Sequence, residues 1–285
     1  MKWRGRRGSS NIVDRRRSSG GRGVAIGGVG GLGAVAIVVI GLFLGVDLTP
    51  LLGGGGGGIQ SGGQREITQA DEEVAQFVSV TLADTEEVWT QIFSEEGIGT
   101  YQPSELVLFS GGIQSGCGGA SSQTGPFYCP NDERIYLDTD FFRMMSQRLG
   151  AGGDFAAAYV VAHEVAHHVQ DELGILAEAN AIRQRVSESE SNAISVRIEL
   201  QADCYSGIWA RYAEANFGSL EPGDIAEAMN AAEAIGDDTL QRNAGGRVVP
   251  DSFTHGTSEQ RQRWFRTGYE QASIPACDTF GTDRL

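Results

Sequence analysis

The stretch VVAHEVAHHVQ at residues 160–170 constrains the fold most, because it places histidine and glutamate inside a run of apolar residues. Asp154 is typical of a helix N-cap and Gly174 of a helix stop, so one helix is predicted from Asp154 to Leu173. Apolar residues fall on every side of this helix. It is therefore expected in the core of a domain rather than on its surface.

His163, Glu164 and His167 form a His-Glu-x-x-His pattern on that helix. Residues four apart lie on one helical face, so both imidazoles can point at a single metal ion. Glu164 lies about 100° around the helix, where it can reach a water molecule beside the ion and accept its proton. The pattern predicts a metal-assisted hydrolase. The alternative is a core helix with two hydrogen-bonded histidines and a chance glutamate.

A third metal ligand is expected on a later helix over residues 187–217. There Glu199 and Asp203 are four apart on one face, so one can hold the metal while the other supports a ligand histidine from behind. The 31 residues between His167 and Glu199 leave room for the chain to turn back across the first helix. A solvated surface glutamate is the alternative for Glu199, but its apolar neighbours favour a ligand. His168 points away from the metal face and is predicted either to be a packing residue or to support a ligand from behind.

Residues 66–285 are predicted to form one α+β domain, mostly helical with a small sheet. A capping box beginning at Thr68 marks its first helix, and the loop that contains Cys117 is rich in glycine and serine. The expected helices cover roughly 68–96, 141–149, 154–173, 187–217, 224–235 and 257–269, and the candidate strands are 106–109 and 134–137.

The first 65 residues differ in composition from the rest. Val24–Gly45 contains 22 residues without a charge, enough at ~1.5 Å per residue to cross ~30 Å of hydrocarbon. The basic head at 1–23 is predicted to stay in the cytoplasm, which places the domain outside. A cleaved signal peptide is the alternative, although its apolar region is usually shorter. Residues 46–65, with GGGGGGIQSGGQ, are predicted to be a flexible linker.

Charge is divided unevenly along the chain. Residues 1–45 carry eight basic residues against the single acidic residue Asp14, whereas residues 46–285 carry 14 basic and 36 acidic residues. An acidic domain repels polyanions at long range, so nucleic-acid binding by the folded part is disfavoured.

The four cysteines indicate an oxidising compartment. Three pairings are possible, of which Cys117–Cys129 with Cys204–Cys277 is the simplest. A cysteine zinc site is disfavoured because no CxxC spacing occurs, and buried free thiols remain the other alternative.

Several blocks together resemble a known family. HEVAHH followed by ELQAD resembles the zincin metallopeptidases whose third ligand is glutamate, the gluzincins. CGGASSQTGPFYCPND, YLD, HEVAHHVQ, ELQADCYSGIWA and THGTSEQRQRWF in this order resemble the predicted neutral zinc metallopeptidase family. The resemblance implies a zincin-like fold, Zn²⁺, a polypeptide substrate and membrane attachment outside the cytoplasm. Its implied ligands are His163, His167 and Glu199, with Glu164 as base and Asp203 behind a ligand histidine.

A further donor is expected for the oxyanion that forms during amide hydrolysis. His255, in the loop before the last predicted helix, is the candidate, with Tyr205 and Tyr269 as weaker substitutes. A loop-fixing role is the alternative for His255. In zincins a strand along the cleft pairs with the substrate backbone, and Ile135–Leu137 is the candidate for that strand.

Two classes of function remain open. The first is a membrane-anchored zinc metallopeptidase, with hydrolysis of another amide, such as a cell-wall peptide crosslink, as a variant. The second is a catalytically silent binding or scaffold module that keeps the fold. Glu164 favours catalysis, because a scaffold has no need of the base. The sequence fixes neither the substrate nor the oligomeric state.

Overall fold

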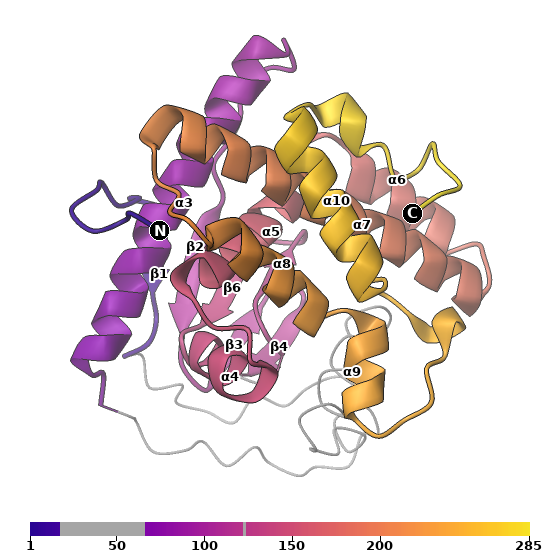
Figure 1. Cartoon of the computed structure of the whole chain (residues 1–285), viewed down its shortest axis with the longest axis horizontal. Helices are drawn as coiled ribbons and strands as arrows, with labels where there is room; N and C mark the ends of the chain where they lie inside the picture. The colour runs from indigo at the N-terminus through magenta and orange to yellow at the C-terminus, as the bar shows by residue number, and fades with distance from the viewer. Residues whose placement is uncertain (18–65, 122–123) are drawn as a thin grey trace.

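The computed structural model describes residues 1–17, 66–121 and 124–285, which form one body in which helices surround the central helix α5 (Figure 1). The elements in chain order are β1 Ile12–Asp14, α3 Gln69–Glu95, β2 Glu105–Phe109, β3 Gly112–Ser115, β4 Gly118–Ser121, β5 Phe127–Cys129, β6 Arg134–Asp138, α4 Asp140–Leu149, α5 Asp154–Glu172, α6 Ile175–Arg183, α7 Glu188–Phe217, α8 Asp224–Ala234, α9 Asp237–Asn243 and α10 Ser258–Gln271. The prediction of a mostly helical α+β domain is confirmed.

Helix α5 is the centre of the packing, as its apolar sequence predicts. It contacts α3, α6, α7 and α8 and, on its other side, strands β5 and β6. Fifteen of its 19 residues are buried, including Phe155 and Tyr159 with no exposed surface. A helix enclosed in this way holds its side chains in fixed rotamers, which is what a metal centre requires.

The sheet lies beside α5 and has the strand order β1-β2-β6-β5. Strands β1, β2 and β6 are parallel, whereas β5 runs antiparallel to β6, with Tyr128 opposite Ile135. Ile135–Leu137 therefore lies on an inner strand between β2 and β5. The prediction that this segment forms the rim of the cleft is wrong, because β5 occupies the end of the sheet order. The glycine-rich segment before β5 contains the hairpin of β3 and β4, which was predicted only as a loop.

Residues 1–17 belong to the folded domain. Strand β1 pairs with β2, Trp3 packs edge-on against Phe77, and the Arg6 guanidinium makes two hydrogen bonds with the Asp84 carboxylate. The predicted domain boundary at residue 66 therefore needs correction for these residues. Pairing across such a distance in sequence leaves no local pattern that could have revealed it.

The end of this N-terminal segment is fixed beside the start of α3. Arg16 is buried, donates to the Asp71 carbonyl at 2.8 Å, and lies 3.0 Å from Glu72. The docking of residues 1–17 on the domain and a single membrane crossing between residues 17 and 66 exclude each other. The cytoplasmic head and the outer domain stay predictions from the sequence. The proposed anchor Val24–Gly45 and the linker 46–65 lie outside the described residues. Within the described ranges, no helix has both the length and the apolar character needed to cross a bilayer.

Helices α7 and α10 cross at unusually short distance, which brings the two halves of the site together. A Cβ atom at Gly207 would lie 2.0 Å from the Phe265 carbonyl oxygen, and one at Gly268 would lie 1.8 Å from the Cys204 carbonyl oxygen. Only glycine allows this approach. The first turn of each helix is also stabilised, because Ser187 begins a capping box at the start of α7 and Thr257 begins one at the start of α10.

The two predicted disulfides are present. Cys117–Cys129 joins the β3–β4 hairpin to β5, and Cys204–Cys277 joins α7 to the C-terminal segment. The first closes one wall of the cavity described below. The second supports the helix that carries Glu199 and Asp203.

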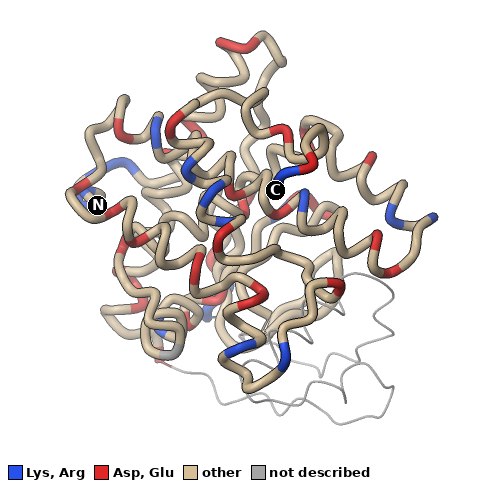
Figure 2. The backbone as a smooth tube through the Cα atoms, turned by 45° about the vertical axis from the view of Figure 1, so that its right-hand side comes forward, with Lys and Arg blue, Asp and Glu red and all other residues tan. Residues whose placement is uncertain are grey.

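Acidic and basic residues are interspersed over this body. Figure 2 shows acidic positions on most of the elements rather than on one face. The figure therefore gives no indication of a single-sign surface.

Candidate metal centre

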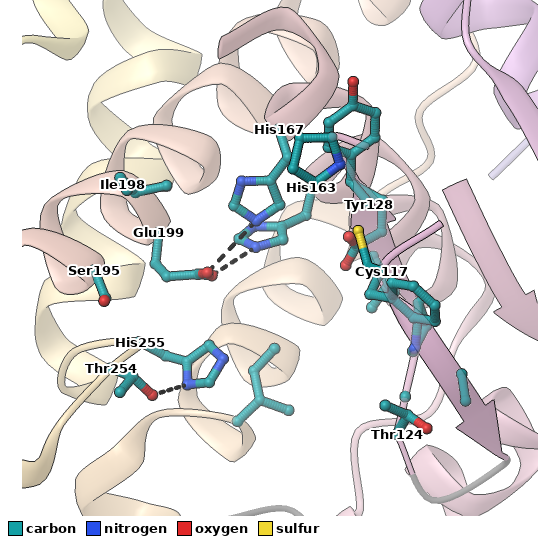
Figure 3. Close-up of a pocket in the computed structure, with 18 of the residues that line it drawn as sticks. Cys117, Thr124, Tyr128, His163, His167, Ser195, Ile198, Glu199, Thr254 and His255 are labelled. Atoms are coloured by element: carbon teal, nitrogen blue, oxygen red, sulfur yellow. Dashed lines mark hydrogen bonds and ion pairs between the residues drawn. The ribbon is translucent and has the colours of Figure 1, made fainter. Parts of the chain in front are cut away.

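The structure brings His163, His167 and Glu199 together, from α5 and α7 (Figure 3). His163 Nε2 lies 3.0 Å from Glu199 Oε2, and His167 Nε2 lies 3.6 Å from Glu199 Oε1. One donor atom from each residue falls within 4.8 Å of the others. The spacing of the two histidines along the helix and the return of α7 across α5 therefore produce the convergence expected from the sequence.

The outer nitrogens of both rings face side-chain oxygen atoms. His163 Nδ1 lies 2.9 Å from Asp203 Oδ1, and His167 Nδ1 donates to Gln170 Oε1 at 2.9 Å. The Gln170 amide nitrogen donates to the Ile198 carbonyl oxygen and to Gln201 Oε1, which fixes its oxygen toward His167. Protons on Nδ1 leave a lone pair on each Nε2, directed at the Glu199 carboxylate.

Electron-rich atoms that face one another in this way require a proton or a cation between them. Burial by itself lowers the pKa of His163, but Asp203 and Glu199 raise it to about 10. Burial likewise raises the pKa of Glu199, yet the neighbouring imidazoles hold it well below its ordinary value. Two imidazole nitrogens and one carboxylate are the donor set of a catalytic zinc site with an open position. The residues present therefore fit zinc.

Asp203 is part of a buried network that sequence analysis found only in part. Its carboxylate accepts hydrogen bonds from Arg261 Nε at 2.8 Å, Arg261 Nη2 at 2.9 Å and the Tyr159 hydroxyl at 2.5 Å. Asp203 has no exposed surface and Arg261 is 2% exposed. Asp203 thus lies behind His163, as predicted, and Arg261 supplies the charge that balances it.

Arg261 and Tyr159 were not recognised from the sequence. Arg261 precedes Trp264 and Phe265 by three and four positions, which places it on the buried stripe of α10. An arginine at that spacing could have been recognised as a buried ion-pair partner.

Glu164 is buried beside the ligands and lines the same cavity. Burial raises its pKa, while the His167 and His163 charges oppose the rise. A carboxylate whose pKa is shifted toward neutrality is suited to taking up and returning a proton.

His255 lines the same cavity on the side of Glu199, in the loop before α10 (Figure 3). Its ring Nδ1 is 3.3 Å from Asp237 Oδ1 and 3.0 Å from Thr254 Oγ1. The Asp237 carboxylate also accepts the backbone N–H groups of Thr254, His255 and Gly256. Burial lowers the pKa of His255, but Glu199 and Asp237 raise it above its usual value. Asp237 therefore fixes both the loop and the ring, and no sequence pattern had identified it.

Comparisons with known proteins agree with this geometry. A family model described as "Putative neutral zinc metallopeptidase" matches residues 1–280. The chain belongs to this family. It is 47% identical to the uncharacterized protein YpfJ of Escherichia coli over 287 residues, covering 99% of each chain. It is 46% identical to an uncharacterized protein of Mycobacterium tuberculosis over 195 residues, covering 65% of each. No solved structure matches significantly.

In this member of the neutral zinc metallopeptidase family, the candidate ligands open onto a cavity of about 500 Å³. One wall is formed by the β3–β4 hairpin and β5, and the opposite wall by α6 and α7. The larger apolar residues that line it are Phe127, Phe141, Met144, Leu149 and Leu176. A cavity of this size accommodates a few side chains of an extended peptide.

The remaining candidates lie elsewhere. His168 Nε2 is 2.6 Å from the Gln102 carbonyl oxygen, and its ring packs against Tyr101 and Tyr128. Of the two roles predicted for His168, these contacts support packing. Tyr205 is buried against Trp89, and neither Tyr205 nor Tyr269 lines the cavity.

Proposed function

We propose that this protein is a zinc metallopeptidase that hydrolyses peptide bonds, with His163, His167 and Glu199 as the zinc ligands. The observation that carries the proposal is the convergence of two Nε2 lone pairs and one carboxylate, with Glu164 buried beside them. Membership of the family supports the class of activity.

Zinc bound at this place would polarise the scissile carbonyl and increase the acidity of water near neutral pH. Glu164 takes a proton from the attacking water molecule as its oxygen forms a bond to the carbonyl carbon. Glu164 then returns a proton to the amine as the C–N bond breaks, so the base is regenerated. Its buried position beside the ligands supports both roles.

His255 is proposed to donate a hydrogen bond to the oxyanion from the loop before α10. Its contacts with Asp237 and Thr254 use Nδ1, which leaves Nε2 to face the cavity. Asp237 and Glu199 also favour the protonated ring, which is the form that donates from both nitrogens. A fixed donor of this kind stabilises charge that develops during the reaction.

The domain is proposed to function outside the cytoplasm, since its two disulfides require an oxidising compartment. Attachment to a membrane through Val24–Gly45 remains a prediction from the sequence. A single crossing by that segment would place residues 1–17 and the domain on opposite sides of the membrane, so it is an alternative to the docked arrangement of residues 1–17.

The activity is tested with wild type and Glu164→Gln, both loaded with zinc, on an unbiased peptide library. We expect Glu164→Gln to bind zinc and fold normally, yet to cleave about 10²–10⁴-fold more slowly. Glu188→Gln, on the exposed start of α7, is the matched control and should cleave like wild type. If zinc-loaded wild type cleaved nothing, the protein would be better explained as a scaffold.

A further inference from the structure

Arg183, the last residue of α6, lines the cavity on the α7 side of the metal centre. Its Nε donates to Ser191 Oγ at 3.3 Å and its Nη1 donates to Asn180 Oδ1 at 3.2 Å. These two neutral partners fix the guanidinium without balancing its charge. The other basic residue that lines the cavity, Arg261, is fully paired with Asp203.

No carboxylate of the described residues lies within ion-pair distance of Arg183. The side chain is nevertheless only partly exposed, and burial lowers its pKa, with the Glu199 charge opposing that effect. A guanidinium that is partly removed from water and lacks an anion is an unfavourable arrangement unless a ligand supplies the anion.

The surroundings of Arg183 are suited to such a ligand. Asn180, Asn192 and Ser195 line the same part of the cavity and carry no charge, so they do not compete for the guanidinium. Two of its five N–H groups are used by Ser191 and Asn180, which leaves the Nη2 edge available. A carboxylate accepts two parallel hydrogen bonds from an edge of this shape.

We propose that Arg183 binds a carboxylate of the substrate, so that the enzyme selects peptides with a carboxylate close to the scissile bond. The inference rests on the proposed peptidase function. The carboxylate is either a free C-terminus or the side chain of an acidic residue, since both present the same planar pair of oxygens. Arg183 is thus assigned to substrate selection rather than to the chemical step.

The test begins with one peptide that wild type cleaves, prepared in matched forms. One pair differs in a free or amidated C-terminus, and the other has glutamate or glutamine beside the scissile bond. We expect wild type to prefer the carboxylate form of one pair by about 10- to 100-fold in kcat/KM, mainly through KM. The pair that shows the preference identifies the source of the carboxylate.

Arg183→Gln should reduce this preference to near unity, and Arg183→Lys should retain part of it because the charge remains without the planar edge. Arg185→Gln is the control, since Arg185 is exposed two residues further on and does not line the cavity. It should keep the wild-type preference. If Arg183 only supported α6, Arg183→Gln would lower cleavage of both peptides alike, and an unchanged preference would overturn the proposal.

A binding measurement separates this proposal from the peptidase function itself. Fluorescence anisotropy of labelled peptides on zinc-loaded Glu164→Gln reports affinity without turnover. We expect tighter binding of the carboxylate form, and loss of the difference in Glu164→Gln/Arg183→Gln. Equal affinities would refute carboxylate selection even if wild type cleaves peptides. A clear difference would support it even if the assignment of the base were wrong.

Discussion

Replacement of Arg261 by glutamine tests the buried network behind the metal centre. Arg261 makes two hydrogen bonds to Asp203, at 2.8 and 2.9 Å, and both side chains are almost completely buried. Removing one member of a buried ion pair leaves the other charge uncompensated and costs about 3–5 kcal/mol. For a domain of about 240 residues, each kcal/mol lowers Tm by roughly 2–4 °C, so a fall of at least about 6 °C is expected.

The effect should also reach the metal site, because Asp203 contacts His163 Nδ1 at 2.9 Å. We expect Arg261→Gln to weaken zinc binding by about 10–100-fold. Arg266→Gln is the matched control, since Arg266 is an exposed residue of the same helix. It should change the free energy of unfolding by less than about 0.5 kcal/mol.

A double-mutant cycle decides whether the pair acts as one unit. Asp203→Asn removes the uncompensated charge, so Arg261→Gln/Asp203→Asn should be destabilised by less than the sum of the single variants, by at least about 1 kcal/mol. Thermal unfolding and a zinc competition assay measure the two effects. Additive losses, or an Arg261→Gln variant as stable as Arg266→Gln, would refute this account of the network.

Three further predictions follow from other parts of the structure. Cys204→Ser/Cys277→Ser removes a disulfide with a sequence separation of 73 residues. Loop-closure entropy then predicts a loss of about 4 kcal/mol in the free energy of unfolding, measured by urea denaturation. A variant as stable as wild type would contradict this. Arg6→Ala leaves the buried Asp84 carboxylate without its two hydrogen bonds, and we expect about 1–3 kcal/mol of destabilisation, with exposed Arg7→Ala as a near-neutral control. Ser10→Cys and Glu96→Cys each place a thiol at an exposed position. Because residues 1–17 pack on the domain, both variants should react equally with a membrane-impermeant thiol reagent on intact cells. Labelling of only one of them would show that residues 1–17 are not docked on the domain.

The convergence of the candidate metal ligands could be predicted because their signal is local. The positions of His163 and His167 on one helical face follow from their spacing, and the buried character of α5 follows from its apolar residues. Glu199 and Asp203 were found in the same way, from a second pair four apart on a predicted helix. The capping box predicted at Thr68 and the helix stop predicted at Gly174 are likewise present in the structure.

The missing parts of the site depend on contacts between distant segments. Tyr159 meets Arg261 across 102 positions, and Arg16 reaches Asp71 across 55. No periodicity within one element records such a contact. Asp237 was missed for a related reason: it is the first residue of a short helix, where an acidic residue is expected on grounds of helix capping alone.

Helix α6 and the β3–β4 hairpin were also absent from the predicted elements. Helix α6 is only nine residues long, and only two of its residues are buried. The hairpin has a high glycine content, which favours a loop in any estimate from propensity. Cys117–Cys129 joins this hairpin to β5, so the disulfide stabilises a conformation that the local residue propensities do not favour.

The zinc content of the purified protein tests the central claim most directly. Metal analysis by mass spectrometry should find about one zinc per chain in wild type and almost none in Glu199→Ala or His167→Ala, because either change leaves two ligands. Asp224→Asn is the control. Asp154, Asp224 and Glu227 form a second acidic cluster. The Met1 amino group, 2.8 Å from Asp154 and 3.3 Å from Asp224, already supplies a positive charge there. This variant should keep its zinc. Zinc-free wild type after exposure to zinc, or equal zinc in wild type and Glu199→Ala, would contradict the account.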